Sequence, residues 1–208
     1  MSSYIMHICV SDIVKRRLNL TDKFVYGSVL PDVLKGVLLD RNGTHYIEKV
    51  VIDGDRRELP NIQRAIDELN IQDNEVRLGY IAHLVEDLIW FNNFIPLYAK
   101  DLGEDKIQFL QDNSMHSKEE YKQTMYADYG RSSEHVINKC EVDIHPLLEN
   151  ILKVTQDEQY QKQILDNTWY PLNADVSENI FMTKESIDNY IDVCTKEVER
   201  VVLELMGE

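Results

Sequence analysis

The residues best suited to chemistry lie in the segment GYIAHLVEDLIW, where His83 precedes Asp87 by four positions. Residues spaced i and i+4 on a helix project from one face about 5–6 Å apart, so this imidazole and this carboxylate can converge on one cation. The rest of the segment is largely apolar, which predicts a helix that is buried on most sides. Because a buried carboxylate is costly unless it is paired, a bound metal is one way to stabilise Asp87.

A hydrogen-bonded core pair would explain His83 and Asp87 taken alone, but three more candidate ligands precede them in the chain. His7 lies in the apolar opening YIMHICV, Asp32 follows a proline in GSVLPDVLKG, and His45 comes just after the polar RNG. Neutral imidazole and carboxylate are usual ligands of zinc, and also of manganese, iron or nickel. The pattern therefore favours a divalent metal site over a simple core pair, with these residues as candidate ligands.

Taken together, these motifs resemble the zinc-dependent phospholipase C family, in particular its poorly characterised bacterial branch. The resemblance rests on the early histidine, the G-x-x-x-PD segment, the TH pair and the HxxxD helix, and it covers under half of the chain. It implies an all-helical fold that binds up to three zinc ions and hydrolyses phosphate esters. We therefore expect an all-α, single-domain multi-helical bundle of this type.

Carried over residue by residue, the resemblance makes Asp32, His45, His83 and Asp87 the ligands of one metal, with His83 and Asp87 as the catalytic pair. Asp87 would bridge to a second ion, for which His7 is a further ligand. The chain departs from the trinuclear members, because FNNFIPLYAKDLG after the motif helix contains no further histidine. The opening MSSYIMH also lacks the basic-then-apolar pattern of a secretory leader, so we expect no ligating amine to be freed by removal of one. We expect one or two ions of zinc or another divalent first-row metal.

The chemistry that this site predicts is metal-dependent hydrolysis of a phosphate ester. A bound divalent ion acidifies a water molecule and polarises a phosphoryl oxygen, and the substrate would be a small phosphate ester or a lipid-like molecule. Three alternatives stay open. They are an HD-type phosphohydrolase, which uses an adjacent His-Asp pair, a catalytically inactive metal-binding helical protein, and a purely structural helical protein in which His83 and Asp87 are hydrogen-bonded.

Three further acidic residues are candidates for supporting roles. Asp128, between tyrosines in YADY, could hold a ligand histidine by its other ring nitrogen. Glu86 and Glu48 lie close to candidate ligands and could act as general bases, although we expect both to be solvated.

Composition favours one domain, residues 1–208, in a reducing cytoplasm. No apolar run approaches the ~18 residues of a membrane span. Three widely spaced cysteines, Cys9, Cys140 and Cys194, indicate buried thiols rather than a disulfide framework. The net charge of −15, from 37 acidic and 22 basic residues, disfavours a nucleic-acid partner, which normally needs a basic patch.

Periodicity predicts helices over most of the chain. They are expected at residues 3–18, at 22–39 with a break at Pro31, from Asn61 onward, from Asn74 or Glu75 towards Phe94, and at 104–113, 117–140, 145–165 and 183–206. Residues 46–59 are expected to be extended, with a turn at Asp53-Gly54. The segment DRNGT is expected to be a loop that delivers His45.

Overall fold

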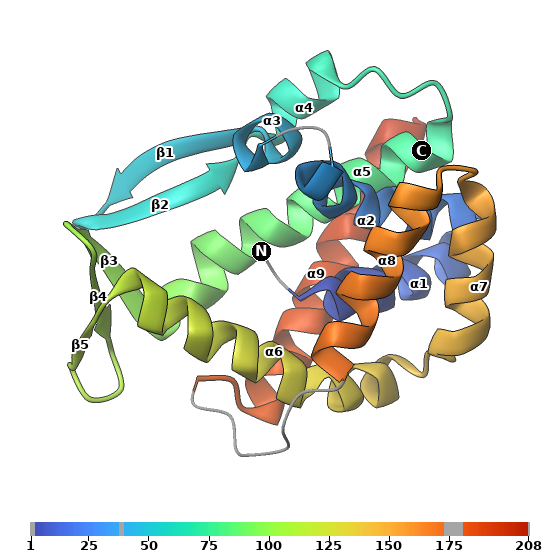
Figure 1. Ribbon diagram of the computed structural model, residues 1–208. Helices are drawn as coiled ribbons and strands as arrows, with labels where there is room; N and C mark the ends of the chain where they lie inside the picture. The colour runs from blue at the N-terminus through green and yellow to red at the C-terminus, as the bar shows by residue number, and fades with distance from the viewer. Residues whose placement is uncertain (1–2, 38–39, 173–180, 208) are drawn as a thin grey trace.

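The computed structural model describes residues 3–37, 40–172 and 181–207, and the fold is mostly helical (Figure 1). Helices make up 71% of the structure, which confirms the helical class, although small sheets are also present. The α-helices of the described residues are α1 (Tyr4–Leu18), α2 (Asp22–Val37), α3 (Arg41–His45), α4 (Ile62–Glu68), α5 (Asn74–Ile89), α6 (Lys118–Cys140), α7 (Ile144–Val154), α8 (Glu158–Leu172) and α9 (Lys184–Met206).

One antiparallel hairpin joins β1 (Ile47–Ile52) to β2 (Asp55–Pro60), as the sequence predicts. The two turn residues, Asp53 and Gly54, have φ of 51° and 76°. Positive φ at both central positions matches the right-handed twist of the flanking strands, and Asp-Gly is one of the pairs that tolerate it best. The expected turn is therefore confirmed.

A second small sheet contains β3 (Ala99–Gly103), β4 (Lys106–Phe109) and β5 (Met115–His116), in that order. The helix expected over residues 104–113 is therefore wrong. Glu104 and Asp105, with φ of 50° and 61°, reverse the chain between β3 and β4. In β4 the pattern KIQF alternates, so that Ile107 and Phe109 are both buried. Both sheets lie at the same end of the molecule, where β2 contacts β3 (Figure 1).

Helix α5 forms the centre of the core, and α1, α2 and α9 all pack against it. Every residue from Leu78 to Asp87 is buried. The contact with α2 is close because two glycines face the partner helix. A Cβ atom on Gly79 would lie 2.0 Å from the carbonyl oxygen of Phe24, and one on Gly27 would lie 2.2 Å from that of Val76. This close approach brings the middle of α2 against the HxxxD motif.

Three expectations about helix boundaries need correction. Pro31 does not break α2, because the helix runs through it to Val37. The segment expected to be a loop, DRNGT, folds instead as the short helix α3. Asp40 caps the N-terminus of this helix, because its side chain accepts a hydrogen bond from the Gly43 N–H at 2.8 Å. The stretch 145–165 is divided between α7 and α8, because the Asp157 side chain accepts from the first backbone N–H groups of α8 and starts a new helix there.

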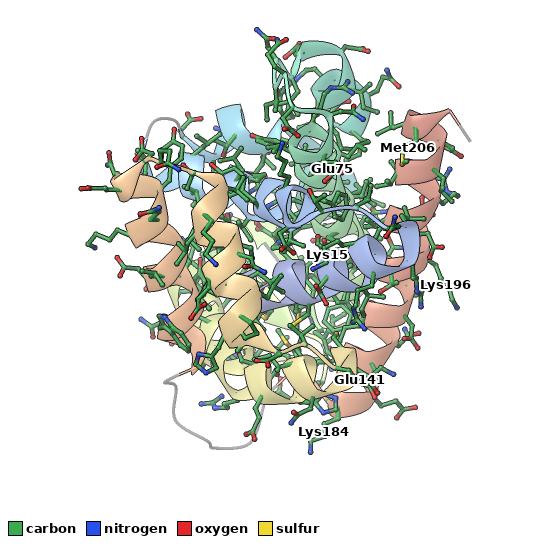
Figure 2. All side chains as sticks on the ribbon, turned by 90° about the vertical axis from the view of Figure 1, so that its right-hand side faces the viewer. Lys15, Glu75, Glu141, Lys184, Lys196 and Met206 are labelled. Atoms are coloured by element: carbon green, nitrogen blue, oxygen red, sulfur yellow. The ribbon has the colours of Figure 1, made fainter. Side chains whose placement is uncertain are left out.

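The last helix, α9, shows the amphipathic pattern that the sequence predicts. Lys184 and Lys196 lie on its exposed side (Figure 2). Its buried positions recur at helical spacing and include Ile187, Tyr190, Ile191, Cys194, Val198 and Val202. The Tyr190 hydroxyl donates a hydrogen bond to the Glu86 carbonyl at 3.2 Å, which ties α9 to the C-terminal part of α5.

After Ile89 the motif helix widens into a π-helical segment, Trp90–Phe94, and then a 3₁₀ turn, Ile95–Leu97. Pro96 lies in that turn, so regular helix ends before it, as expected. Trp90 is buried and stacks on Phe94 with ring centroids 4.5 Å apart, so it packs as part of the core. Within the described residues, no helix is both long enough and apolar enough to cross a bilayer.

Candidate metal centre

The five candidate ligands come from four helices and meet in the interior. His7 lies on α1, Asp32 on α2, His45 at the end of α3, and His83 and Asp87 on α5. All five are buried; Asp32, at 7% exposure, is the only one of them with any surface in contact with solvent. Their ligand atoms form two groups, His7–His83–Asp87 and Asp32–His45–His83, in each of which the atoms lie within 4.8 Å of one another. His83 belongs to both groups.

The two histidines of the second group point ring nitrogens at each other. His83 Nε2 lies 3.1 Å from His45 Nε2. His83 Nδ1 lies 2.7 Å from the carbonyl oxygen of Ser28, which can only accept, so this nitrogen carries the proton and Nε2 carries a lone pair. Burial and the positive charge of His7 lower the pKa of His83 well below its ordinary value, which keeps the ring neutral.

His45 is oriented in the same way. Its Nδ1 lies 2.7 Å from the Thr44 hydroxyl oxygen. That hydroxyl can donate its own proton to the carbonyl oxygen of Asp40 or Arg41, which lie 3.3 and 3.4 Å away. Its oxygen can therefore accept a hydrogen bond from Nδ1 of the His45 ring. The His45 Nε2 lone pair then faces that of His83, and two such lone pairs repel unless a proton or a metal ion neutralises them. Two nitrogens bound to tetrahedral zinc at 2.0–2.1 Å would be about 3.3 Å apart, close to the observed separation.

Asp32 supplies the carboxylate of this group. Its Oδ1 lies 3.3 Å from His45 Nε2 and makes no hydrogen bond, while the ammonium group of Lys35 lies 3.7 Å away. Although burial opposes ionisation, the close approach of His45 and the positive charge of Lys35 hold the pKa of Asp32 below its ordinary value. An ionised carboxylate and two imidazole nitrogens thus converge on one point, which is a ligand set suited to a divalent metal.

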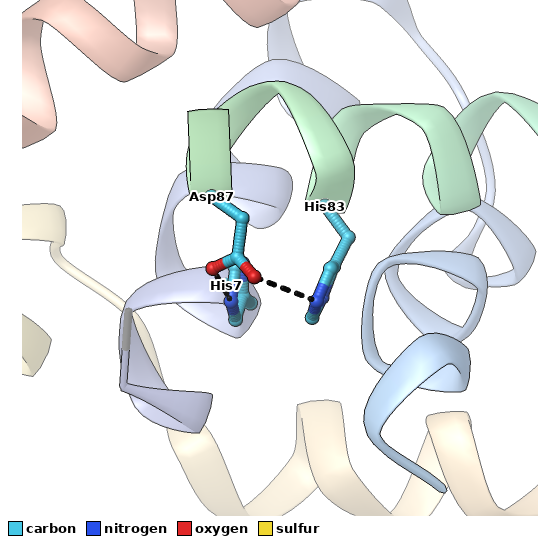
Figure 3. Close-up of side chains that lie close together, drawn as sticks. All are labelled: His7, His83 and Asp87. Carbon is cyan, nitrogen blue, oxygen red and sulfur yellow. Dashed lines mark ion pairs between the residues drawn. The ribbon is translucent and has the colours of Figure 1, made fainter. Parts of the chain in front are cut away.

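Asp87 faces both groups with different oxygens. Its Oδ1 lies 3.6 Å from His7 Nε2, and its Oδ2 lies 3.9 Å from His83 Nε2 (Figure 3). The same Oδ2 also lies 3.9 Å from His45 Nε2. The rings of His7 and His83 stack with centroids 3.8 Å apart. This is the arrangement that a carboxylate bridging two ions would need. It also places His83 and Asp87 one helical turn apart, unlike the adjacent pair of an HD-type site.

Glu86 corrects an expectation, because it is fully buried rather than solvated. Its Oε2 lies 3.1 Å from His7 Nδ1, so the two carboxylates of α5 contact opposite nitrogens of one imidazole. Burial raises the pKa of Glu86 to about 7, against the opposing charge of His7. Sequence reasoning missed this contact. The sequence did contain a sign of this burial, because the residues on either side of Glu86 and Asp87 are apolar, and a helix that is apolar on all sides is buried on all sides.

The two remaining acidic candidates lie in different surroundings. Glu48 is exposed, as expected, and accepts a hydrogen bond from Asn61 at 2.6 Å. Asp128 is buried and its Oδ2 accepts from the backbone N–H groups of Phe181 and Met182 at 2.7 and 3.1 Å. These contacts give Asp128 a structural role in holding the segment that leads into α9. Its expected role in orienting a ligand histidine stays a prediction.

A cleft of about 510 Å³ lies beside the cluster. Its lining includes Lys35, which pairs with Asp32, and Trp90, three residues after Asp87 on the same helical path. Small-molecule sites typically occupy ~300–1,000 Å³, so the cleft is large enough for a drug-sized ligand. None of the five candidate ligands is among its lining residues, and Lys35 is the lining residue that contacts one of them.

Comparison of the chain with models of protein families, with curated proteins and with solved structures found no match.

Proposed function

We propose that the protein is a metal-dependent phosphoesterase of the phospholipase C-like type. The observation that carries the proposal is the pair of facing Nε2 atoms of His45 and His83, 3.1 Å apart, with Asp32 Oδ1 3.3 Å from one of them. A buried arrangement of lone pairs and carboxylate oxygens of this kind is stabilised most directly by a cation. The resemblance of the first half of the chain to zinc-dependent phospholipases C supports the same family and the same bundle type.

One ion would be held by Asp32, His45 and His83. A second would be held by His7, after its ring had released the proton that gives it a positive charge, with Asp87 as the carboxylate between the two ions. Zinc, or another divalent first-row metal, fits this set of nitrogen and oxygen donors. When bound, such an ion supplies Lewis acidity toward a phosphoryl oxygen and toward water.

The protein groups around the cluster prepare its residues for that role. The Ser28 carbonyl and the Thr44 hydroxyl hold the two Nε2 lone pairs toward one point, so neither ring has to turn on binding. Glu86 holds His7 by Nδ1 and leaves Nε2 toward Asp87. The site is therefore preorganised by neighbours that are themselves buried and fixed.

The substrate in this proposal is a small phosphate ester or a lipid-like molecule, and the compartment is the cytoplasm. The cleft beside the cluster supports a small substrate. The three cysteines are free and buried, which supports a reducing compartment. The net charge of −15 supports a partner other than nucleic acid.

The first experiment is metal analysis of purified variants together with hydrolysis of aryl phosphate monoesters and diesters. His83→Ala should lose metal and activity most completely, because His83 belongs to both groups of ligands. His135→Ala is the matched control, since this histidine lies outside the cluster and pairs with Asp188 at 2.8 Å. Inactivity of protein loaded with zinc, manganese, iron or nickel, or equal metal content in the two variants, would contradict the proposal.

The second candidate function is metal binding without catalysis, and burial of the ligands favours it. Four of the five candidate ligands are 0% exposed, which leaves little room for substrate at the ions. A catalytic site keeps an open coordination position, whereas a structural site is closed. Stoichiometric metal with no hydrolysis, together with spectra of a cobalt-substituted protein that do not change on adding phosphate, would favour this second function.

A further inference from the structure

The cleft beside the cluster differs in charge from the rest of the chain. The chain carries 37 acidic and 22 basic residues, but basic residues dominate the cleft. The acidic residues that line it are Asp55, Glu58 and Asp101, and the basic ones are Lys35, Arg41, Arg56, Arg57, Lys118 and Lys122. A concave surface with an excess of one charge concentrates the field and attracts ligands of opposite charge. An anionic ligand is therefore the one that this cleft fits.

One end of the cleft adjoins the candidate metal centre. Lys35 lines the cleft and lies 3.7 Å from Asp32 Oδ1. Tyr126 also lines it, and burial together with the charge of Asp32 raises the pKa of its hydroxyl, while Arg41 opposes that rise. Lys35 and Tyr126 thus mark the end of the cleft toward Asp32, and Arg41, which pairs with Glu58 at 2.8 Å, lies close enough to Tyr126 for its charge to act on that hydroxyl.

Further along the cleft, two cations are free to meet a ligand. Arg57 pairs with Asp55 at 2.7 Å, and Lys118 pairs with Asp101 at 2.8 Å. In contrast, Arg56 and Lys122 are exposed and have no hydrogen bond or ion pair within the part of the chain that the structure describes. Lys122 and Tyr129 both line the cleft from α6. They are seven positions apart, so the rise of 1.5 Å per residue separates them by about 10 Å along the helix.

The wall of the cleft between its Lys35 end and its Arg56 and Lys122 end is apolar and largely aromatic. It is built by the π-helical segment after α5, by β3 and β4, and by α6. Phe91 and Tyr126 contribute to it, and the Tyr126 side chain is 52% exposed. Exposed aromatic rings on a concave wall offer a stacking surface for a flat apolar group.

We propose that this cleft is the substrate site and that it selects compact phosphate esters with a flat apolar body and a second anionic group. The phosphate lies toward Lys35 and Arg41, the body packs on the Phe91 and Tyr126 wall, and the second anion meets Arg56 and Lys122. This inference rests on the proposed phosphoesterase function for its catalytic meaning, but the binding that it describes requires neither metal nor turnover. It narrows the substrate class to small dianionic or polyanionic esters, in place of a zwitterionic lipid.

Calorimetric titration with a naphthalene disulfonate tests the binding directly, because this probe is flat, carries an anion at each end and has no phosphate to hydrolyse. We expect saturable binding to the wild type that weakens as salt is added. The double variant Arg56→Gln/Lys122→Gln should bind about tenfold more weakly, as expected for the loss of two exposed charge contacts. The control Lys106→Gln/Lys162→Gln removes the same charge from exposed lysines outside the cleft lining and should bind as the wild type does.

The results separate this proposal from that of the phosphoesterase function. Absence of probe binding to the wild type, or equal affinity in the two double variants, overturns the cleft assignment whatever the enzyme assay shows. If hydrolysis is found, the Arg56→Gln/Lys122→Gln variant should raise KM for a sulfonated naphthyl phosphate about tenfold, with kcat and metal content unchanged, and should leave KM for the unsubstituted naphthyl phosphate as it is. Equal KM changes for both esters would overturn the assignment of the second anion.

Discussion

Substitution of Gly79 by alanine tests how the fold positions the cluster. Gly79 lies one helical turn before His83, at the point where α5 packs on α2. An added Cβ would lie 2.0 Å from the Phe24 carbonyl oxygen and 2.9 Å from Gly27 Cα. Both obstacles are backbone atoms, so no side-chain rotation can relieve the overlap, and α2 must move away from α5. That movement displaces the Ser28 carbonyl that orients His83.

The expected change in the free energy of unfolding of Gly79→Ala has two opposing contributions. Overpacking a well-packed interior costs about 1–3 kcal/mol, and the backbone obstacles place Gly79→Ala at the upper end of that range. Alanine in place of glycine in a helix contributes about 1 kcal/mol of stability in return. We therefore expect a net loss of about 2 kcal/mol in the free energy of unfolding, or about 4–8 °C in Tm for a chain of this length.

Urea denaturation and metal titration of the same variant provide the readout. Gly79→Ala should unfold at lower urea concentration with an unchanged m-value and should bind metal more weakly than the wild type. Gly27→Ala, which meets the Val76 carbonyl oxygen at 2.2 Å from the other side of the contact, should behave alike. Equal or greater stability of Gly79→Ala would show that helix propensity outweighs the contact, and would refute the close approach of α2 and α5.

Three further predictions concern the cluster and its surroundings. Verified removal of metal by a chelator should lower Tm by on the order of 10 °C, since a ligand at a thousand times its Kd contributes about 4 kcal/mol; an unchanged Tm would contradict coupling of the site to the fold. Glu86→Gln should weaken binding of the ion at His7 by about 10–100-fold in a metal titration that resolves two sites, and equal affinity there would show that Glu86 does not orient His7. Asp128→Asn should cost about 2 kcal/mol in urea denaturation with unchanged metal content, because its carboxylate accepts from the Phe181 and Met182 amides; loss of metal would instead favour a direct role at the site.

The parts of the fold that were predictable have local causes. The β1–β2 turn follows from Asp53-Gly54, and the extent of α9 follows from its Thr183 cap and the spacing of its apolar residues. The strands near residues 99–116 were missed because their segments are only two to five residues long. In so short a stretch an alternating pattern and a helical one cannot be distinguished by periodicity. The pairing of β3 with β4 depends on backbone conformation at Glu104 and Asp105, two residues with no strong turn signal.

The convergence of His7, Asp32, His45, His83 and Asp87 was inferred by resemblance, since only His83 and Asp87 share an element that sequence spacing can relate. The remaining contacts join four helices, and helix packing geometry is a tertiary property. Gly27 and Gly79 illustrate the limit, because a glycine in a helix lowers helix propensity, and only the packed structure shows that each accommodates a neighbouring backbone.

Glu86 shows what stricter physical reasoning could have recovered. The sequence LVEDLIW contains two adjacent acids in an otherwise apolar helix. Adjacent residues project from a helix about 100° apart. If Asp87 is buried against the cluster, Glu86 is therefore exposed only when the neighbouring face of α5 is polar. No polar face exists here, and the observed burial of both carboxylates follows. A second buried carboxylate must have a partner, and the hydrophobic pattern of α5 therefore requires a cation or a protonated group beside Glu86. That this group is His7, almost eighty residues earlier, is the step that only the packing of α1 on α5 supplies.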